Sequence, residues 1–137
     1  MNNKIPENGN NTADGELRPE MKLWVHKGSG VFGPGIAELL IHVKKTGSVK
    51  SACEEMGVSY SKANKIIPFA EDKLGCKLVL RQQGGKPGES RSVLTETGIE
   101  LIERYEAFVN ECREMMQMAF DRHFEGFSLG RVGDEHD

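Results

Sequence analysis

Polar side chains that can hydrogen-bond or carry positive charge gather in one short stretch of the sequence, SYSKANK, at residues 59–65. Lysine suits phosphates and guanine edges, asparagine can pair with adenine, and serine or tyrosine hydroxyls reach backbone oxygens. The residue types in this stretch therefore predict that it contacts a polar, anionic polymer. The predicted contact residues in this stretch are Ser59, Tyr60, Ser61, Lys62, Asn64 and Lys65.

Two short helical patterns, separated by Gly57, position this stretch. Ser48 is expected to cap the first helix and Ser59 the second. The expected buried positions are Val49, Ala52, Cys53 and Met56 in the first helix and Ala63, Ile66, Ile67, Ala70 and Leu74 in the second. Two helices joined by a short glycine turn form a helix-turn-helix, whose second helix places its amino end in the major groove of DNA.

A hairpin is predicted directly after the second helix, with strands at residues 78–81 and 91–94 and a tip containing Gly84, Gly85, Pro87 and Gly88. It carries Arg81, Lys86 and Arg91, which is the arrangement of a wing, and its glycines let the backbone approach phosphates closely. Exposed polar residues on an amphipathic helix are often only a solvated face. The adjacent basic hairpin favours DNA binding over that interpretation.

Charge is strongly segregated along the chain, although its formal net charge is only −3. Residues 44–91 hold ten lysines and arginines against five acidic residues, whereas residues 95–137 hold four against eleven. Because salt screens surface charges beyond roughly 8–10 Å, the local field matters more than the total. The centre of the chain is therefore the part predicted to meet a polyanion.

Two segments, TGSVKSACEEMGVSYSKA and GGKPGESRSVLTETGIELIERYE, closely resemble the amino-terminal DNA-binding domain of the ModE-type molybdate-responsive regulators. More distantly, they resemble the LysR-type regulators. The resemblance covers about residues 22–124 and implies a winged helix-turn-helix, a transcriptional regulator and a homodimer. It matches residues 59–65 to the start of the recognition helix and residues 83–91 to the wing. Oxyanion-binding domains follow in full-length ModE relatives and are not found here, so the resemblance gives no ground to infer molybdate sensing.

The remaining sequence predicts a disordered tail at residues 1–20, a strand at 21–27 that includes Trp24, a glycine-rich loop at 28–35, and a first helix at 36–46. The expected domains are a winged helix-turn-helix at residues 21–94, a long helix at 95–124 and a flexible tail at 125–137. Pro68 is expected to kink or widen its helix. The predicted fold class is mainly α with a small β wing, ending in a long C-terminal dimerisation helix.

The long helix, capped by Thr95, would extend roughly 43 Å at 1.5 Å per residue, more than one small domain can cover. Apolar residues three and four apart form a heptad-like seam, widened by Leu101, Phe108 and Met115. We therefore expect a homodimer through this helix, against the alternative that it packs only on its own domain. The predicted interface residues are Ile102, Tyr105, Val109, Cys112, Met116, Ala119 and Phe120.

The sequence offers no paired acid and base, no nucleophile with an activating partner and no phosphate-cradling motif, so we expect no enzyme, cofactor or metal. It has no apolar run long enough to span a membrane and no signal segment, and its three cysteines fit reduced thiols in the cytoplasm. The sequence identifies no small-molecule effector. The alternative function is a winged-helix module that binds a protein partner through its acidic C-terminal helix and does not contact DNA.

Overall fold

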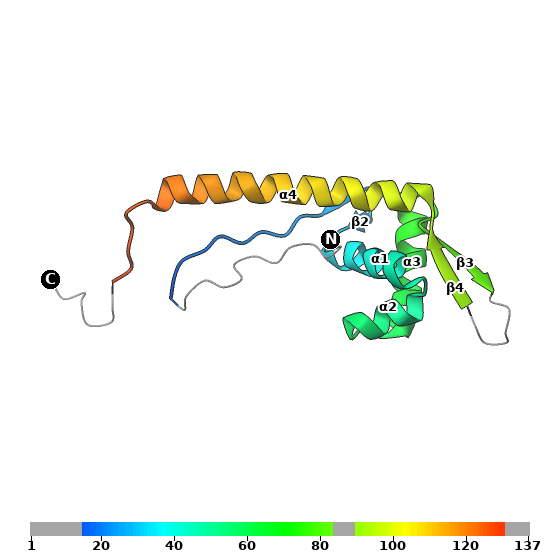
Figure 1. The fold of residues 1–137 in the computed structure, drawn as a ribbon. Coiled ribbons are helices and arrows are strands. Elements are labelled where there is room, and N and C mark those ends of the chain that lie inside the picture. The colour runs from blue at the N-terminus through cyan, green and yellow to red at the C-terminus, as the bar shows by residue number, and fades with distance from the viewer. Residues whose placement is uncertain (1–14, 84–89, 131–137) are drawn as a thin grey trace.

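The computed structural model describes residues 15–83 and 90–130. The described elements are, in chain order, β1 (Val25–Lys27), β2 (Gly30–Phe32), α1 (Pro34–Thr46), α2 (Val49–Met56), α3 (Tyr60–Leu74), β3 (Val79–Gln83), β4 (Ser90–Leu94) and α4 (Glu96–Phe124). Helices α1, α2 and α3 form a cluster below the first half of α4, and the β3–β4 hairpin projects from one side (Figure 1). The predicted fold class, mainly α with a small β wing followed by a long helix, is confirmed.

Serine side chains cap α2 and α3, the two helices of the predicted helix-turn-helix, at the positions that the sequence predicts. The hydroxyl of Ser48 accepts a hydrogen bond from the Ser51 amide at 3.1 Å, and that of Ser59 accepts one from the Lys62 amide at 3.1 Å. Gly57, between the two helices, has a φ of 69°, in the left-handed region that glycine adopts without steric cost. The turn between α2 and α3 is therefore set by residues within it.

The core lies where α1 meets the helices and strands around it. Ala37, Leu40 and Val43 of α1 are fully covered, and Leu78, just before β3, is equally buried. Phe32, at the end of β2, places its ring edge-on against Tyr105 of α4 at 5.2 Å between centroids. Packing of this kind stabilises helices that are too short to be stable alone.

Two expectations about this region are wrong. Residues 28–35, predicted to be a loop, contain strand β2, which pairs antiparallel with β1 and joins Val25 to Phe32. The strand forms because Phe32 anchors it in the core, which local composition does not reveal. Ile66 is exposed instead of buried, because the inward stripe of α3 passes through its neighbour Ile67.

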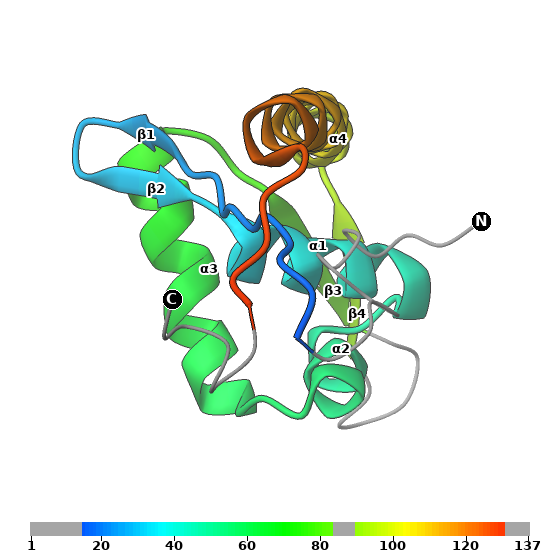
Figure 2. The same cartoon turned by 90° about the vertical axis from the view of Figure 1, so that its left-hand side faces the viewer.

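Helix α4 begins on top of the wing. The hydroxyl of Thr95 accepts a hydrogen bond from the Gly98 amide at 2.9 Å and donates one to the Lys77 carbonyl at 2.7 Å. A β-carbon at Gly98 would lie 2.6 Å from the Leu78 carbonyl oxygen, so only glycine allows this approach. Figure 2 views α4 along its axis and shows it crossing above α1.

The first half of the predicted dimer seam is used within the chain. Ile102, Tyr105 and Val109 are buried in the domain's own core, and the Tyr105 hydroxyl donates to the Leu23 carbonyl at 2.7 Å. Further along α4, Cys112, Met116, Ala119 and Phe120 are only partly covered. These four residues therefore keep surface that a second chain could contact, whereas the first three do not. No helix within residues 15–83 and 90–130 combines the length and apolarity needed to cross a membrane.

Replacing Gly98 by alanine is expected to lower the free energy of unfolding by about 1–3 kcal/mol, because the added methyl group forces α4 away from Leu78. Gly35→Ala is the matched control, since nothing lies within 4 Å of a β-carbon at that position. Urea titration followed by circular dichroism measures both. Equal stability of the two variants would contradict the close approach.

Candidate nucleic-acid interface

The amino end of α3 presents the predicted polar residues on the outside of the domain. Ser61, Lys62 and Lys65 are exposed, while Ala63 and Ile67 on the opposite side of the helix are buried. The Ser59 hydroxyl is already engaged in capping. The exposed surface therefore carries the ammonium groups of Lys62 and Lys65 and the hydroxyl of Ser61. It lies at the amino end of α3, where the helix dipole is positive.

Arg81 of β3 joins the wing to this end of α3. Its Nη1 donates to the Tyr60 hydroxyl at 3.2 Å, and its Nη2 donates to the side-chain oxygen of Asn64. The guanidinium carbon lies 6.0 Å from the centroid of the Tyr60 ring. Asn64 accepts from Arg81 with its side-chain oxygen, and its amide group is the donor that faces the Tyr60 hydroxyl.

This cluster changes the acidity of Tyr60. Hydrogen bonds from Asn64 and then from Arg81 stabilise the phenolate and lower the pKa of Tyr60 below its ordinary value of 10.0. In contrast, burial raises the pKa of the Cys53 thiol above 9.0. Cys53 is therefore a small, neutral core residue where α2 meets α3.

The two described arginines of the wing lie on different faces of the hairpin. Arg81 stands opposite Ser92, which is buried, so this pair belongs to the inner face. Arg91 stands opposite Gln82 and belongs to the outer face, together with exposed Leu80 and Val93. Lys86, the third predicted contact on the wing, lies outside the described residues. The structure thus brings Arg81, but not Arg91, to α3.

Glu71 fastens the other end of α3 to the same strand, a role that sequence reasoning missed. One oxygen of its carboxylate accepts hydrogen bonds from the Leu78 amide at 2.7 Å and the Val79 amide at 3.1 Å. The other oxygen lies 3.5 Å from the Lys77 ammonium. A glutamate eight residues before the start of a strand carries no recognisable signal, because the contact depends on how the chain turns between them.

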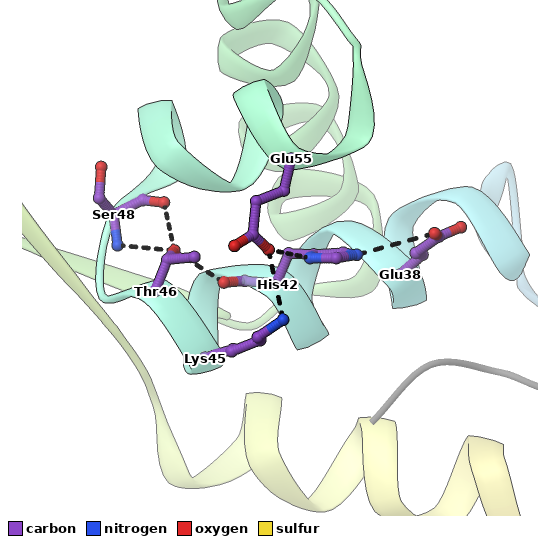
Figure 3. Close-up of polar contacts among 6 residues, drawn as sticks. All are labelled: Glu38, His42, Lys45, Thr46, Ser48 and Glu55. Atoms are coloured by element: carbon purple, nitrogen blue, oxygen red, sulfur yellow. Dashed lines mark hydrogen bonds and ion pairs between the residues drawn. The ribbon is translucent and has the colours of Figure 1, made fainter. Parts of the chain in front are cut away.

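A polar cluster holds α2 against α1 (Figure 3). His42 Nδ1 lies 2.7 Å from the carboxylate of Glu55, and Lys45 Nζ lies 3.8 Å from the same oxygen. The Thr46 hydroxyl donates to the His42 carbonyl at 2.7 Å and steadies the end of α1. At the wing, the Ser92 amide donates to the Gly47 carbonyl at 2.8 Å. The helix pair and the wing are therefore joined at several points.

Among the residues the structure describes, no three His, Cys, Asp or Glu side chains come close enough together to hold a metal ion. The site consists of basic and hydroxyl groups on an exposed surface. The chemistry of these groups suits binding to a polyanion.

Comparison with known proteins agrees with this geometry. Residues 37–99 match the model of the bacterial regulatory helix-turn-helix proteins of the lysR family. This part of the chain, from α1 to the start of α4, is therefore similar to the helix-turn-helix DNA-binding domains of the LysR type. The match gives no support to ModE-type molybdate specificity. No curated protein sequence matches the chain.

The two tyrosines are expected to titrate in separate steps, Tyr60 below pH 10 and Tyr105, whose pKa burial raises, above it. Replacing Arg81 by glutamine removes a donor to the phenolate, so the lower step should move up while the Tyr105 step stays in place. Ultraviolet difference spectroscopy near the phenolate band follows both. A lower step that does not move would show that Arg81 does not contact Tyr60 in solution.

Proposed function

We propose that the protein is a sequence-specific regulator of transcription that binds double-stranded DNA as a homodimer and catalyses no reaction. The observation that carries this proposal is that the segment matching the LysR-family model is also the one that exposes Lys62 and Lys65 at the start of α3. Placed in the major groove, α3 would present Ser61, Lys62 and Lys65 to phosphates and base edges. The amide group of Asn64 would be the donor nearest to these residues on the wing side.

The wing has a secondary part in this proposal. Arg81 is committed to Tyr60 and Asn64, so its main effect would be to hold α3 at a fixed angle to the hairpin. Arg91, on the outer face, would meet the DNA backbone beside the groove. The acidic residues of α4 would be repelled by phosphates, which favours a single docking orientation.

Dimerisation would use a different stripe of α4 from the one that packs on the domain. Leu101, Phe108 and Met115 recur every seven residues on one side of the helix. Cys112, four residues after Phe108, and Ala119, four residues after Met115, lie on the same side. Leu101 packs partly against the core, but Phe108 and Met115 are exposed, so the stripe is uncovered in the single chain around these two residues. Met116 and Phe120 instead continue the line of the core residues, and Phe120 lines a pocket with Leu17 of the segment preceding β1.

The double substitution Lys62→Glu with Lys65→Glu is expected to reduce affinity for a duplex, selected from randomised DNA, by at least about tenfold at low salt. The charge reversal puts repulsion where α3 would meet phosphates, and both side chains are exposed, so the fold is kept. Fluorescence anisotropy measures the affinity, and circular dichroism checks the fold.

The matched control is Lys22→Glu with Arg104→Glu, which changes the net charge equally at two exposed positions outside the helix-turn-helix. It should change affinity by less than about threefold. If both double variants lose affinity for the duplex equally, the DNA is attracted by the net charge of the protein and not by specific contacts with Lys62 and Lys65. If the unmodified protein ignores every duplex at low salt yet retains a protein partner, the alternative interaction module is favoured.

Met115→Asp is expected to convert a dimer of twice 15.2 kDa into a monomer, because it places a charge in the apolar stripe of α4. Asn110→Asp adds the same charge on another side of the helix and should leave the dimer intact. Light scattering after size-exclusion chromatography at about 20 μM protein distinguishes them. A monomeric unmodified protein at that concentration would refute dimerisation through α4.

A further inference from the structure

An apolar groove lies on the side of α3 that faces the β1–β2 hairpin. Figure 2 shows this hairpin beside α3. It has a volume of about 500 Å³, and its walls include Trp24, Val31, Ile66 and Phe69. Trp24 is 52% exposed and Phe69 is 58% exposed, and Val31 and Ile66 are exposed as well. Four apolar side chains around one hollow form a surface that resembles a binding site more than an ordinary solvent-facing helix.

The tryptophan wall of this groove lies against the backbone. A β-carbon at Gly33 would collide with Cδ1 and Nε1 of Trp24, so the indole lies directly against the peptide at that glycine. A larger residue there would displace the ring. The groove therefore has the Trp24 indole as one wall and one aromatic ring, Phe69, on the facing helix.

The charge around the groove is positive. Lys65 is the one ionisable side chain among the residues that line it. The ammonium of Lys73 lies 5.6 Å from the centroid of the Phe69 ring, just beyond the lining. An occupant that satisfies both features has a flat apolar body between Trp24 and Phe69 and an anionic group at Lys65.

We propose that this groove binds a small aromatic carboxylate. The ring would stack against Trp24 and Phe69, and the carboxylate would pair with the Lys65 ammonium. Because the site is open, pairing with Lys65 occurs near water and adds a modest selectivity for the anion, while most of the affinity comes from the apolar walls.

Binding of the aromatic carboxylate does not depend on the proposed function, but its effect on DNA binding does. Lys65 would serve the carboxylate and DNA phosphates alternately, since one ammonium cannot contact both fully. A bound aromatic carboxylate would therefore weaken DNA binding, which makes the groove a point at which a small molecule regulates the protein.

Nuclear magnetic resonance of the ¹⁵N-labelled protein, without DNA, tests the binding. Trp24 is the only tryptophan, so a single indole N–H signal reports from the groove. Titration with 1-naphthoate should shift this signal and the Gly33 amide in a saturable way. The uncharged 1-naphthamide should bind about threefold to fivefold more weakly.

Three variants localise the contacts. Phe69→Ala removes an exposed ring without disturbing the core and should weaken 1-naphthoate binding about tenfold. Lys65→Gln should remove the preference for 1-naphthoate over 1-naphthamide. Lys50→Gln, on α2 and also exposed, is the control and should change neither affinity.

The proposal fails if the indole signal does not shift, if 1-naphthoate and 1-naphthamide bind equally, or if Phe69→Ala has no effect. It also fails if the same signals shift with protein concentration alone, because a second copy of the chain would then fill the groove. If 1-naphthoate binds but leaves the affinity for DNA unchanged, the groove stands and the assignment of Lys65 to DNA is wrong.

Discussion

Both ends of α3 are tied to strand β3, and the geometry of the candidate interface depends on this. Near the amino end, the Arg81 guanidinium joins Tyr60 and Asn64, and near the carboxyl end the Glu71 carboxylate accepts the first amides of the strand. The Glu71 side chain is only 10% exposed, so its hydrogen bonds are worth more than those of a surface ion pair. These two polar contacts thus help to set the angle between α3 and the wing.

Because β3 is attached to α3 through Arg81, the basic residues of this region have different roles. Arg81 is used to position α3, and Lys62 and Lys65 remain exposed for a ligand. The helix-turn-helix domain therefore has a basic surface on one helix, while the acid-rich helix α4 leads away from it (Figure 1). Such a division of charge over one small domain orients an approaching polyanion before any specific contact forms.

The apolar surfaces are divided in a similar way. One stripe of α4 completes the core with Tyr105 and Val109, a second stripe around Met115 stays uncovered, and a separate aromatic groove borders α3. Lys65 lines that groove and also belongs to the basic surface, so the two proposed ligands would meet at one side chain. The spacing of apolar residues in α4 is the same for both stripes, which explains why sequence reasoning merged them into one seam.

The amino-acid sequence by itself determined the features that depend on neighbouring residues. Ser48, Ser59 and Thr95 cap helices through amides three residues away, and Gly47, Gly57 and Gly75 end helices through their own backbone angles. Only the tertiary structure decided which face of α4 is buried, that β2 forms, that Ile66 is exposed, and that Arg81 contacts Asn64. These contacts join residues 17 to 82 positions apart, and no local pattern encodes them, because they arise only when the chain has folded around a shared core.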